Sequence, residues 1–261
     1  MLNLIWTGAL SVGGLMLLLW LIHLPLRNAA VVDAGWAGGL ALLGALYGFM
    51  GSGWAPRRAL IAVMAVVWGL RLALYLLLTR VIGQAEEGRY VQLRTQWGKH
   101  IALKFLLFFE FQAVLSLLLG TPFLLAALNP RPVFSFLEYA AAILWLVAMS
   151  GEALADAQLN AFKKYAMNHG KTCRSGLWRY SRHPNYFFEW LIWVAFALFA
   201  LASPLGYLAL FCPLLMLYFL FKVTGIPATE AQALRSRGEE YRRYQETTSA
   251  FVPWFPKKGN Q

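Results

Sequence analysis

Long runs of apolar residues are the feature that most limits what this chain can fold into. A helix needs roughly 20 consecutive apolar residues to cross the hydrocarbon core of a bilayer. Six runs approach or exceed that length, and a glycine-rich run from Ala34 to Met50 makes a seventh. The six are Leu2–Leu24, Leu60–Thr79, Ile101–Leu128, Phe134–Met149, Tyr186–Ala202 and Leu205–Val223. We therefore predict an all-α integral membrane protein with seven transmembrane helices.

The proportion of charged residues supports the same interpretation. Only 13% of the residues are charged and 59% are hydrophobic, whereas a soluble domain carries about a quarter charged residues. The first apolar run lacks a basic leader and exceeds the length of a signal-peptide core, so we expect it to be a retained helix.

The basic residues indicate how the chain is oriented. The net charge is +11, but the basic residues fall between apolar runs, which favours topology signals over a nucleic-acid partner. They gather in the connections 80–104 and 163–182 and in the tail after residue 222, whereas Arg57, Arg58 and Arg131 fall on the other side. Seven crossings place all three basic regions in the cytoplasm, with the N-terminus outside and the C-terminus in the cytoplasm.

The chain reads as a single domain over residues 1–261, with no internal repeat. Proline and glycine stand where the helices should end, at Pro25, at Gly51–Pro56, at Asn129–Pro132 and at Ser203–Pro204. The glycines of the second run are interpreted as close-packing positions between helices. The two cysteines, Cys173 and Cys212, are interpreted as structural thiols.

Five acidic residues lie inside apolar runs or at their ends. They are Asp33, Glu110, Glu152, Asp156 and Glu189. An ionised carboxylate in such a position costs several kcal/mol unless it is paired or hydrated, so each is a candidate functional group. The alternatives are a buried ion pair or a side chain that reaches the interface.

One helix face carries acidic, amide and basic groups in order. Glu152, Asp156, Asn160 and Lys163 follow one another at helical spacing, so they share a face near the cytoplasmic end of the fifth helix. Such a face suits a ligand with hydroxyls and amides near the carboxylates and phosphates near the lysine. A solvated helix end is the alternative.

The segment Gly176–Glu189 leads from a basic connection into the sixth helix. Arg182 and His183 precede Pro184, a residue that starts helices, while Asn185 and Glu189 share a face in the first turn. An anionic ligand would meet arginine, histidine and a helix N-terminus together. A capping histidine is the alternative.

Several other chemistries lack their motifs. The sequence has no glycine-rich dinucleotide fingerprint after a strand, no phosphate-binding loop and no paired histidine or cysteine ligands. We therefore expect no Rossmann domain and no catalytic metal. A nucleotide would have to bind among membrane helices and their cytoplasmic connections.

The segments Ser181-Arg-His-Pro-Asn-Tyr-Phe-Phe-Glu189 and Thr224-Gly-Ile-Pro-Ala-Thr-Glu230 resemble the steroid 5-alpha-reductase family and its bacterial relatives. The resemblance runs from about Asp33 to Pro253, with its specific motifs in the second half. It implies NADPH held in a cavity open to the cytoplasm, and reduction of the delta-4 double bond of a 3-oxo-steroid or a similar apolar enone. It also implies that residues of about 134–256 bind the cofactor and that the N-terminal helices face the substrate.

The resemblance assigns roles by position. Asn185 and Glu189 match family residues at the nicotinamide end and the neighbouring ribose, and Asp156 matches an aspartate of the fifth helix. Two departures are Glu152, where the family has asparagine, and Lys163, where it has arginine. The cofactor residues predicted in this way, together with the basic connections, are Arg71, Arg80, Glu152, Asp156, Asn160, Lys163, Lys171, Arg174, Trp178, Tyr180, Arg182, His183, Asn185, Tyr186, Glu189, Glu230, Arg235 and Tyr241.

The predicted catalytic pair is Asp33 with Tyr75. Asp33 falls near the family's catalytic glutamate, but Trp68 replaces its catalytic tyrosine, so Tyr75 is the predicted phenol and Tyr47 the next candidate. Enone reduction needs a donor at the carbonyl oxygen as the enolate forms. Asp33 in apolar surroundings would keep or share a proton and supply that donor.

A rival family shares part of this pattern. Isoprenylcysteine and phospholipid methyltransferases carry a related Arg-His-Pro motif on a similar membrane fold and bind S-adenosylmethionine. Because the basic connections suit the extra phosphate of NADPH, we favour the reductase, and a non-enzymatic membrane protein is the third alternative. We expect membrane lipids and an apolar substrate entering from lipid as partners, no nucleic acid, and a bacterial inner membrane location with the cofactor side cytoplasmic. The sequence is compatible with a monomer.

Overall fold

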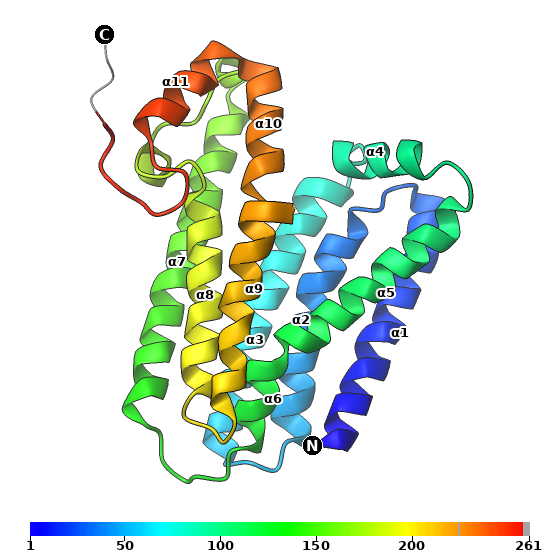
Figure 1. The fold of residues 1–261 in the computed structure, drawn as a ribbon, viewed down its shortest axis with the longest axis vertical. Helices are drawn as coiled ribbons and strands as arrows, with labels where there is room; N and C mark the ends of the chain where they lie inside the picture. Colours follow the sequence, from blue (N-terminus) through cyan, green and yellow to red (C-terminus); the bar gives the residue numbers. More distant parts are fainter. Residues whose placement is uncertain (224, 258–261) are drawn as a thin grey trace. The chain divides into compact units, whose positions relative to one another are not determined.

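The computed structural model describes residues 1–223 and 225–257, and the regular elements of that part of the chain are all helical (Figure 1). The α-helices are α1 Leu2–Leu26, α2 Val31–Met50, α3 Ala55–Leu76, α4 Gly88–Trp97, α5 Ile101–Leu119, α6 Thr121–Leu128, α7 Phe136–Lys164, α8 Pro184–Ala200, α9 Phe211–Tyr218, α10 Ile226–Arg237 and α11 Glu239–Thr247. Two π-helical turns, η1 Leu77–Val81 and η5 Phe219–Val223, continue α3 and α9. Short 3₁₀ turns are η2 Ala166–Asn168, η3 Gly176–Arg179 and η4 Gly206–Leu210.

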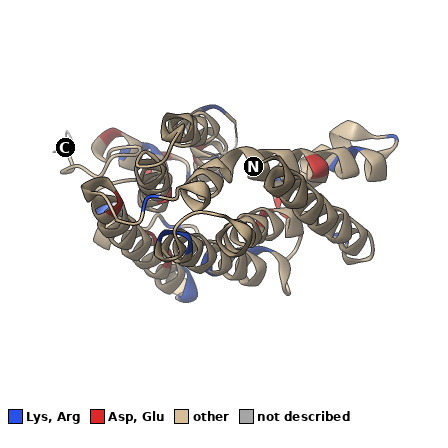
Figure 2. Ribbon diagram, turned by 90° about the horizontal axis from the view of Figure 1, so that it is seen from below, with Lys and Arg blue, Asp and Glu red and all other residues tan. Residues whose placement is uncertain are grey.

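All seven apolar runs form helices, which makes the chain an integral membrane protein. Among the described residues, six helical stretches are long and apolar enough to cross a membrane. They are Leu2–Leu26, Val31–Met50, Ala55–Val81, Ile101–Leu128, Phe136–Lys164 and Gly206–Arg237. Helix α8 is also apolar but has only 17 residues. Seen from the end that carries the N-terminus, most of the helical ribbon is neither acidic nor basic (Figure 2).

Helix boundaries differ from the predicted punctuation at two places. Pro25 lies inside the last turn of α1, and the left-handed residue Arg27 ends that helix instead. The run that begins at Ile101 is divided at Gly120, where Pro122 starts a new helix. Helix α7 continues past its apolar run to Lys164, as the helical spacing of its polar residues predicted.

The chain divides into two compact units, which we describe separately. Unit 1 is Met1–Glu138 with Phe199–Ala209, and unit 2 is Tyr139–Leu198 with Leu210–Gln261. The boundary at residue 138 lies close to the position, about 134, where the sequence predicts the cofactor-binding half to begin.

In unit 1, α2 packs against α1, α3 and α5. The α2–α3 contact is close because glycines face alanines. A Cβ atom on Gly44 would lie 2.4 Å from the Cβ of Ala65, and one on Gly48 would lie 2.5 Å from that of Ala62. The close-packing interpretation of these glycines is therefore confirmed.

A buried ion pair fixes the end of unit 1 that precedes α7. Arg57 and Glu138 are fully buried and paired through Nε and Oε1. Arg57 also donates to the carbonyl oxygens of Asn129, Arg131 and Val133. These bonds satisfy the guanidinium and hold the Asn129–Pro132 turn.

In unit 2, α7 and α8 approach each other at Gly151, where an added Cβ would lie 2.4 Å from the Phe188 ring. The tail folds back onto this unit, where Phe251 packs with Leu220 and Ile226 against α8. The basic connection after α7 and the pair α10–α11 lie at the same end of unit 2 (Figure 1).

Candidate functional site

Asp33 is the centre of a charged cluster in unit 1. It lies in the first turn of α2, and its Oδ2 accepts hydrogen bonds from Arg80 (3.4 Å) and from Arg89. Its Oδ1 accepts a 2.8 Å bond from the Tyr90 hydroxyl. Glu87 pairs with both arginines, at 3.3 Å and 2.8 Å. The cluster joins α2, the π-turn η1 and α4.

The predicted setting of Asp33 is therefore wrong. The sequence placed the carboxylate in apolar surroundings, but two guanidinium groups and a phenol surround it, with the side chain 19% exposed. Arg80, predicted to bind a cofactor, pairs with Asp33. The phenol on Asp33 is Tyr90 and not Tyr75, and Tyr47 lies about 21 Å further along α2 by the rise of a helix.

Tyr90 keeps its proton and donates a hydrogen bond to the carboxylate. It lies on α4, it is 1% exposed, and burial followed by the negative charge of Asp33 raises its pKa well above the usual range. The phenol is thus protonated near neutral pH. Arg71 and Tyr75 are both half-buried and four residues apart, so they share a face of α3.

Helix α4 is held in place by a second ion pair. Arg94 on α4 binds Glu86 at 2.7 Å, and Glu86 accepts a 2.7 Å bond from the backbone N–H of Ala29. Asn28 donates to the carbonyl oxygen of Arg80 at 3.2 Å. The α1–α2 connection, the end of α3 and α4 are thus tied together at one end of unit 1, opposite the N-terminus (Figure 1).

In unit 2, the acid-to-base face of α7 has the predicted order. Glu152 is 3% and Asp156 is 5% exposed, Asn160 is half-buried and Lys163 is exposed. The carboxylates are therefore shielded from water, while the lysine end is accessible. Because all four lie on one helix at spacings of three or four residues, they form a continuous polar stripe.

Helix α8 adds an amide and a carboxylate to this stripe. It begins at Pro184 as predicted, and Asn185 Nδ2 donates to Asp156 Oδ1 at 3.3 Å. Glu189, one turn later, is 8% exposed and accepts a 3.0 Å bond from Trp193 Nε1. We name Glu152, Asp156, Asn185 and Glu189 the carboxylate cluster.

Arg182 and His183 meet a different partner. Arg182 Nε donates to Glu230 Oε1 at 2.6 Å, and His183 Nε2 lies 3.2 Å from the same oxygen. Gln245 donates to Glu230 Oε2 at 2.8 Å. Arg182 also donates to the carbonyl oxygens of Gln245 and Thr248. These groups, predicted as direct cofactor ligands, form an internal network around Glu230.

Four aromatic residues that the sequence predicts as cofactor ligands pack around this network and the connection before α8. Trp178 donates to the carbonyl oxygen of Ala155 at 2.9 Å, which fixes the connection against α7. The Tyr186 ring stacks on His183 with centroids 5.3 Å apart. Tyr180 accepts a backbone bond from the tail. Tyr241 is buried on α11, and burial followed by the charge of Glu230 raises its pKa to about 12.

The remaining predicted basic residues are exposed. Lys171 and Arg174 lie in the connection after α7, and Arg235 lies on α10. The Arg174 guanidinium lies 5.4 Å from the centroid of the Tyr244 ring and donates to the carbonyl oxygen of Glu240. These side chains remain accessible to an anionic ligand at that end of unit 2.

Sequence reasoning missed Arg89, Tyr90 and Gln245. All three act through partners distant in sequence, so spacing alone gave no signal for them. Among the described residues, no group of three or more histidine, cysteine, aspartate or glutamate side chains is arranged to hold a metal ion.

Comparison with known proteins places the chain in a family. A family described as proteins of unknown function, DUF1295, matches residues 19–248. The chain belongs to the DUF1295 family. An uncharacterized protein of Schizosaccharomyces pombe is 30% identical to it over 213 residues, which cover 71% of this chain and 61% of that protein. The chain thus spans less than two thirds of the length of this relative. No solved structure matches.

The DUF1295 match contains all three groups of polar residues. Asp33 and its partners, the carboxylate cluster and the Glu230 network all lie between residues 19 and 248. The aromatic tail beyond Val252 lies outside that range.

Proposed function

We propose that this chain is a membrane-embedded, NADPH-dependent reductase that acts on the double bond of an apolar enone, of which delta-4-3-oxo-steroids are the prototype. The observation that carries the proposal is the Asp156–Asn185 contact of 3.3 Å between α7 and α8. Glu152 and Glu189, one helical turn from Asp156 and Asn185 on the same two helices, are also buried. Buried polar groups on membrane-spanning helices are candidates for a functional site.

The chemistry of these residues fits a dinucleotide. Carboxylates accept hydrogen bonds from ribose hydroxyls, and the Asn185 amide can both donate to and accept from a nicotinamide carboxamide. Phosphates would be held by the exposed basic groups Lys163, Lys171, Arg174 and Arg235. Arg182 and His183 instead hold the tail through Glu230. When bound, NADPH supplies the hydride.

The proton would come from the Asp33–Tyr90 pair of unit 1. The phenol is protonated near neutral pH and is hydrogen-bonded to the carboxylate, which is the partly exposed member of the pair. Arg80 and Arg89 orient the carboxylate. A protonated phenol can donate a hydrogen bond to the developing enolate oxygen and stabilise it without a metal. Tyr75 is the competing assignment.

The same proposal fixes a topology and a substrate class. We propose seven crossings, with α8 as the sixth, the N-terminus outside and the basic connections in the cytoplasm of a bacterial cell. A flat apolar substrate would enter from lipid, since the spanning helices expose leucine, phenylalanine and tryptophan side chains.

A methyltransferase is the second candidate. Three carboxylates close together would also suit the sulfonium and ammonium groups of S-adenosylmethionine. The test of reduction is isotopic: purified protein is incubated with a delta-4-3-oxo-steroid and NADPH deuterated at C4 of the nicotinamide. Deuterium in a saturated product supports the proposal. Absence of turnover with a panel of apolar enones, together with methyl transfer from S-adenosylmethionine, would overturn it.

A further inference from the structure

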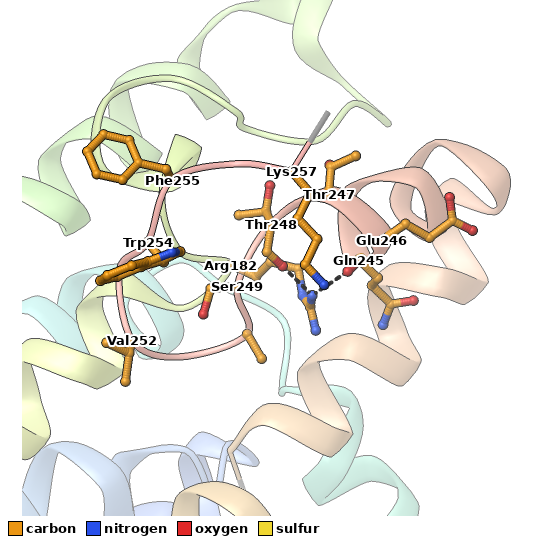
Figure 3. A pocket seen from close by; sticks show the side chains of 11 residues that line it. Arg182, Gln245, Glu246, Thr247, Thr248, Ser249, Val252, Trp254, Phe255 and Lys257 are labelled. Carbon is orange, nitrogen blue, oxygen red and sulfur yellow. Dashed lines mark hydrogen bonds between the residues drawn. The ribbon is translucent and has the colours of Figure 1, made fainter. Parts of the chain in front are cut away.

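A hollow in unit 2 is formed mainly by the C-terminal tail (Figure 3). Its volume is about 540 Å³, within the range of small-molecule sites. The residues that line it are Arg182, Gln245, Glu246, Thr247, Thr248, Ser249, Ala250, Val252, Trp254, Phe255 and Lys257. We name it the tail pocket.

The wall of the tail pocket is fixed before any ligand arrives. The backbone N–H of Lys257 donates to the Thr247 carbonyl at 2.8 Å, which closes the segment into a ring. The N–H of Trp254 donates to the Tyr180 carbonyl at 2.9 Å, and the N–H of Arg182 donates to the Ser249 carbonyl at 2.8 Å. A wall pinned in this way loses little conformational entropy on binding.

Two aromatic side chains stand exposed on this ring. Trp254 is 70% and Phe255 is 75% exposed, and their rings meet edge to face with centroids 6.2 Å apart. Phe255 also meets the Tyr180 ring at 6.1 Å. The aromatic surface is therefore held in position yet uncovered, which suits a flat ring that stacks on it.

Polar groups complete the lining. Lys257 supplies an ammonium group, Thr248 and Ser249 supply hydroxyls, and Glu246 supplies a carboxylate. A base needs an aromatic surface, a ribose needs acceptors for its hydroxyls, and a phosphate needs a cation. An adenosine phosphate presents all three parts, whereas a lipid headgroup has no ring to stack.

We infer that the tail pocket binds the phosphoadenosine part of a nucleotide, with the base against Trp254 and a phosphate at Lys257. This inference rests on the proposed function, in which that nucleotide is NADPH and the group at Lys257 is its 2′-phosphate. It assigns a binding role to residues 252–257, which no sequence motif marks.

The probe is adenosine 2′,5′-bisphosphate, titrated calorimetrically against the full chain in detergent. We expect Trp254→Ala to weaken its binding by roughly tenfold, or about 1.4 kcal/mol, and Trp254→Phe, which keeps a ring, to retain most of the affinity. Lys257→Gln should weaken this probe by a similar factor, with a smaller effect on unphosphorylated adenosine. Trp6→Ala is the matched control, since Trp6 is 61% exposed on α1.

The outcomes separate this inference from the proposed function. If wild-type protein binds NADPH and the Trp254 and Lys257 variants bind both NADPH and the probe with wild-type affinity, the pocket assignment is wrong while the reductase proposal stands. The emission of Trp254 is the difference between the wild-type and Trp254→Phe spectra. If brominated lipids quench this emission and the probe does not, the aromatic pair faces the bilayer, and the inference is overturned. If wild-type protein binds neither nucleotide, both fail.

Discussion

Asn185 at the start of α8 donates a hydrogen bond to Asp156 in the C-terminal part of α7, across 3.3 Å. The two residues are 29 positions apart and come from helices that are otherwise largely apolar. Their contact joins the acid-to-base stripe of α7 to the first turn of α8. The proposed cofactor site depends on this junction.

The packing of α2 on α3 predicts a steric effect. Gly44→Ala should lower the free energy of unfolding by about 1–3 kcal/mol, because the new methyl group would overlap the side chain of Ala65. Thermal unfolding in detergent measures the loss. Gly14→Ala is the control, since nothing lies within 4 Å of a Cβ there. Equal melting temperatures for both variants would contradict the close α2–α3 contact.

The Glu230 network predicts a structural role for that carboxylate. Glu230→Ala leaves Arg182, His183 and Gln245 without an acceptor, so the free energy of unfolding should fall by about 1–3 kcal/mol. Hydrogen exchange should rise in residues 245–251, which Arg182 holds. Glu239→Ala removes a carboxylate whose side chain is 71% exposed and should change neither quantity. A stable Glu230→Ala protein that has lost only NADPH binding would identify Glu230 as a ligand instead.

The Asp33–Tyr90 contact predicts which phenol serves the reaction. Asp33→Asn and Tyr90→Phe should each slow enone reduction by roughly 10²-fold, since each removes one member of the proposed proton-donating pair. The dissociation constant of NADPH should stay near the wild-type value. Tyr75→Phe makes the same chemical change on α3 and should be nearly silent.

Two results would contradict that assignment. Wild-type turnover by Asp33→Asn would exclude acid assistance at this position. A slow Tyr75→Phe variant beside an active Tyr90→Phe variant would restore Tyr75 as the catalytic phenol.

The basic connections predict a topology. A reporter fused after Gln261 should be cytoplasmic, and one inserted at the Asn129–Pro132 turn should be external. With seven crossings in all, the three basic regions lie on one side of the membrane and that turn lies on the other. Reporters on the same side would mean that one helix, most simply the 17-residue α8, does not cross.

The sequence predicted the helices well because the length needed to span a bilayer is a local property. The start of α8 followed from Pro184, a residue that starts helices. The shared faces of Glu152 with Asp156 and of Asn185 with Glu189 followed from helical spacing. The partners of Asp33 did not, since Arg89 and Tyr90 lie 56 and 57 residues away on a short polar helix. The Glu230 network depends in the same way on the fold-back of the tail.

The central claim is that the carboxylate cluster binds NADPH, and the most direct measurement is nucleotide affinity in wild-type protein and in Asn185→Ala. Titration of the detergent-solubilised wild type should give an NADPH affinity roughly tenfold higher than that for NADH, a difference of about 1.4 kcal/mol. Asn185→Ala should lose most NADPH affinity with little change in its melting temperature without cofactor, whereas Ser150→Ala, an exposed position on α7, should bind normally. Equal NADPH affinities in wild type and Asn185→Ala, or binding of S-adenosylmethionine alone, would contradict the account.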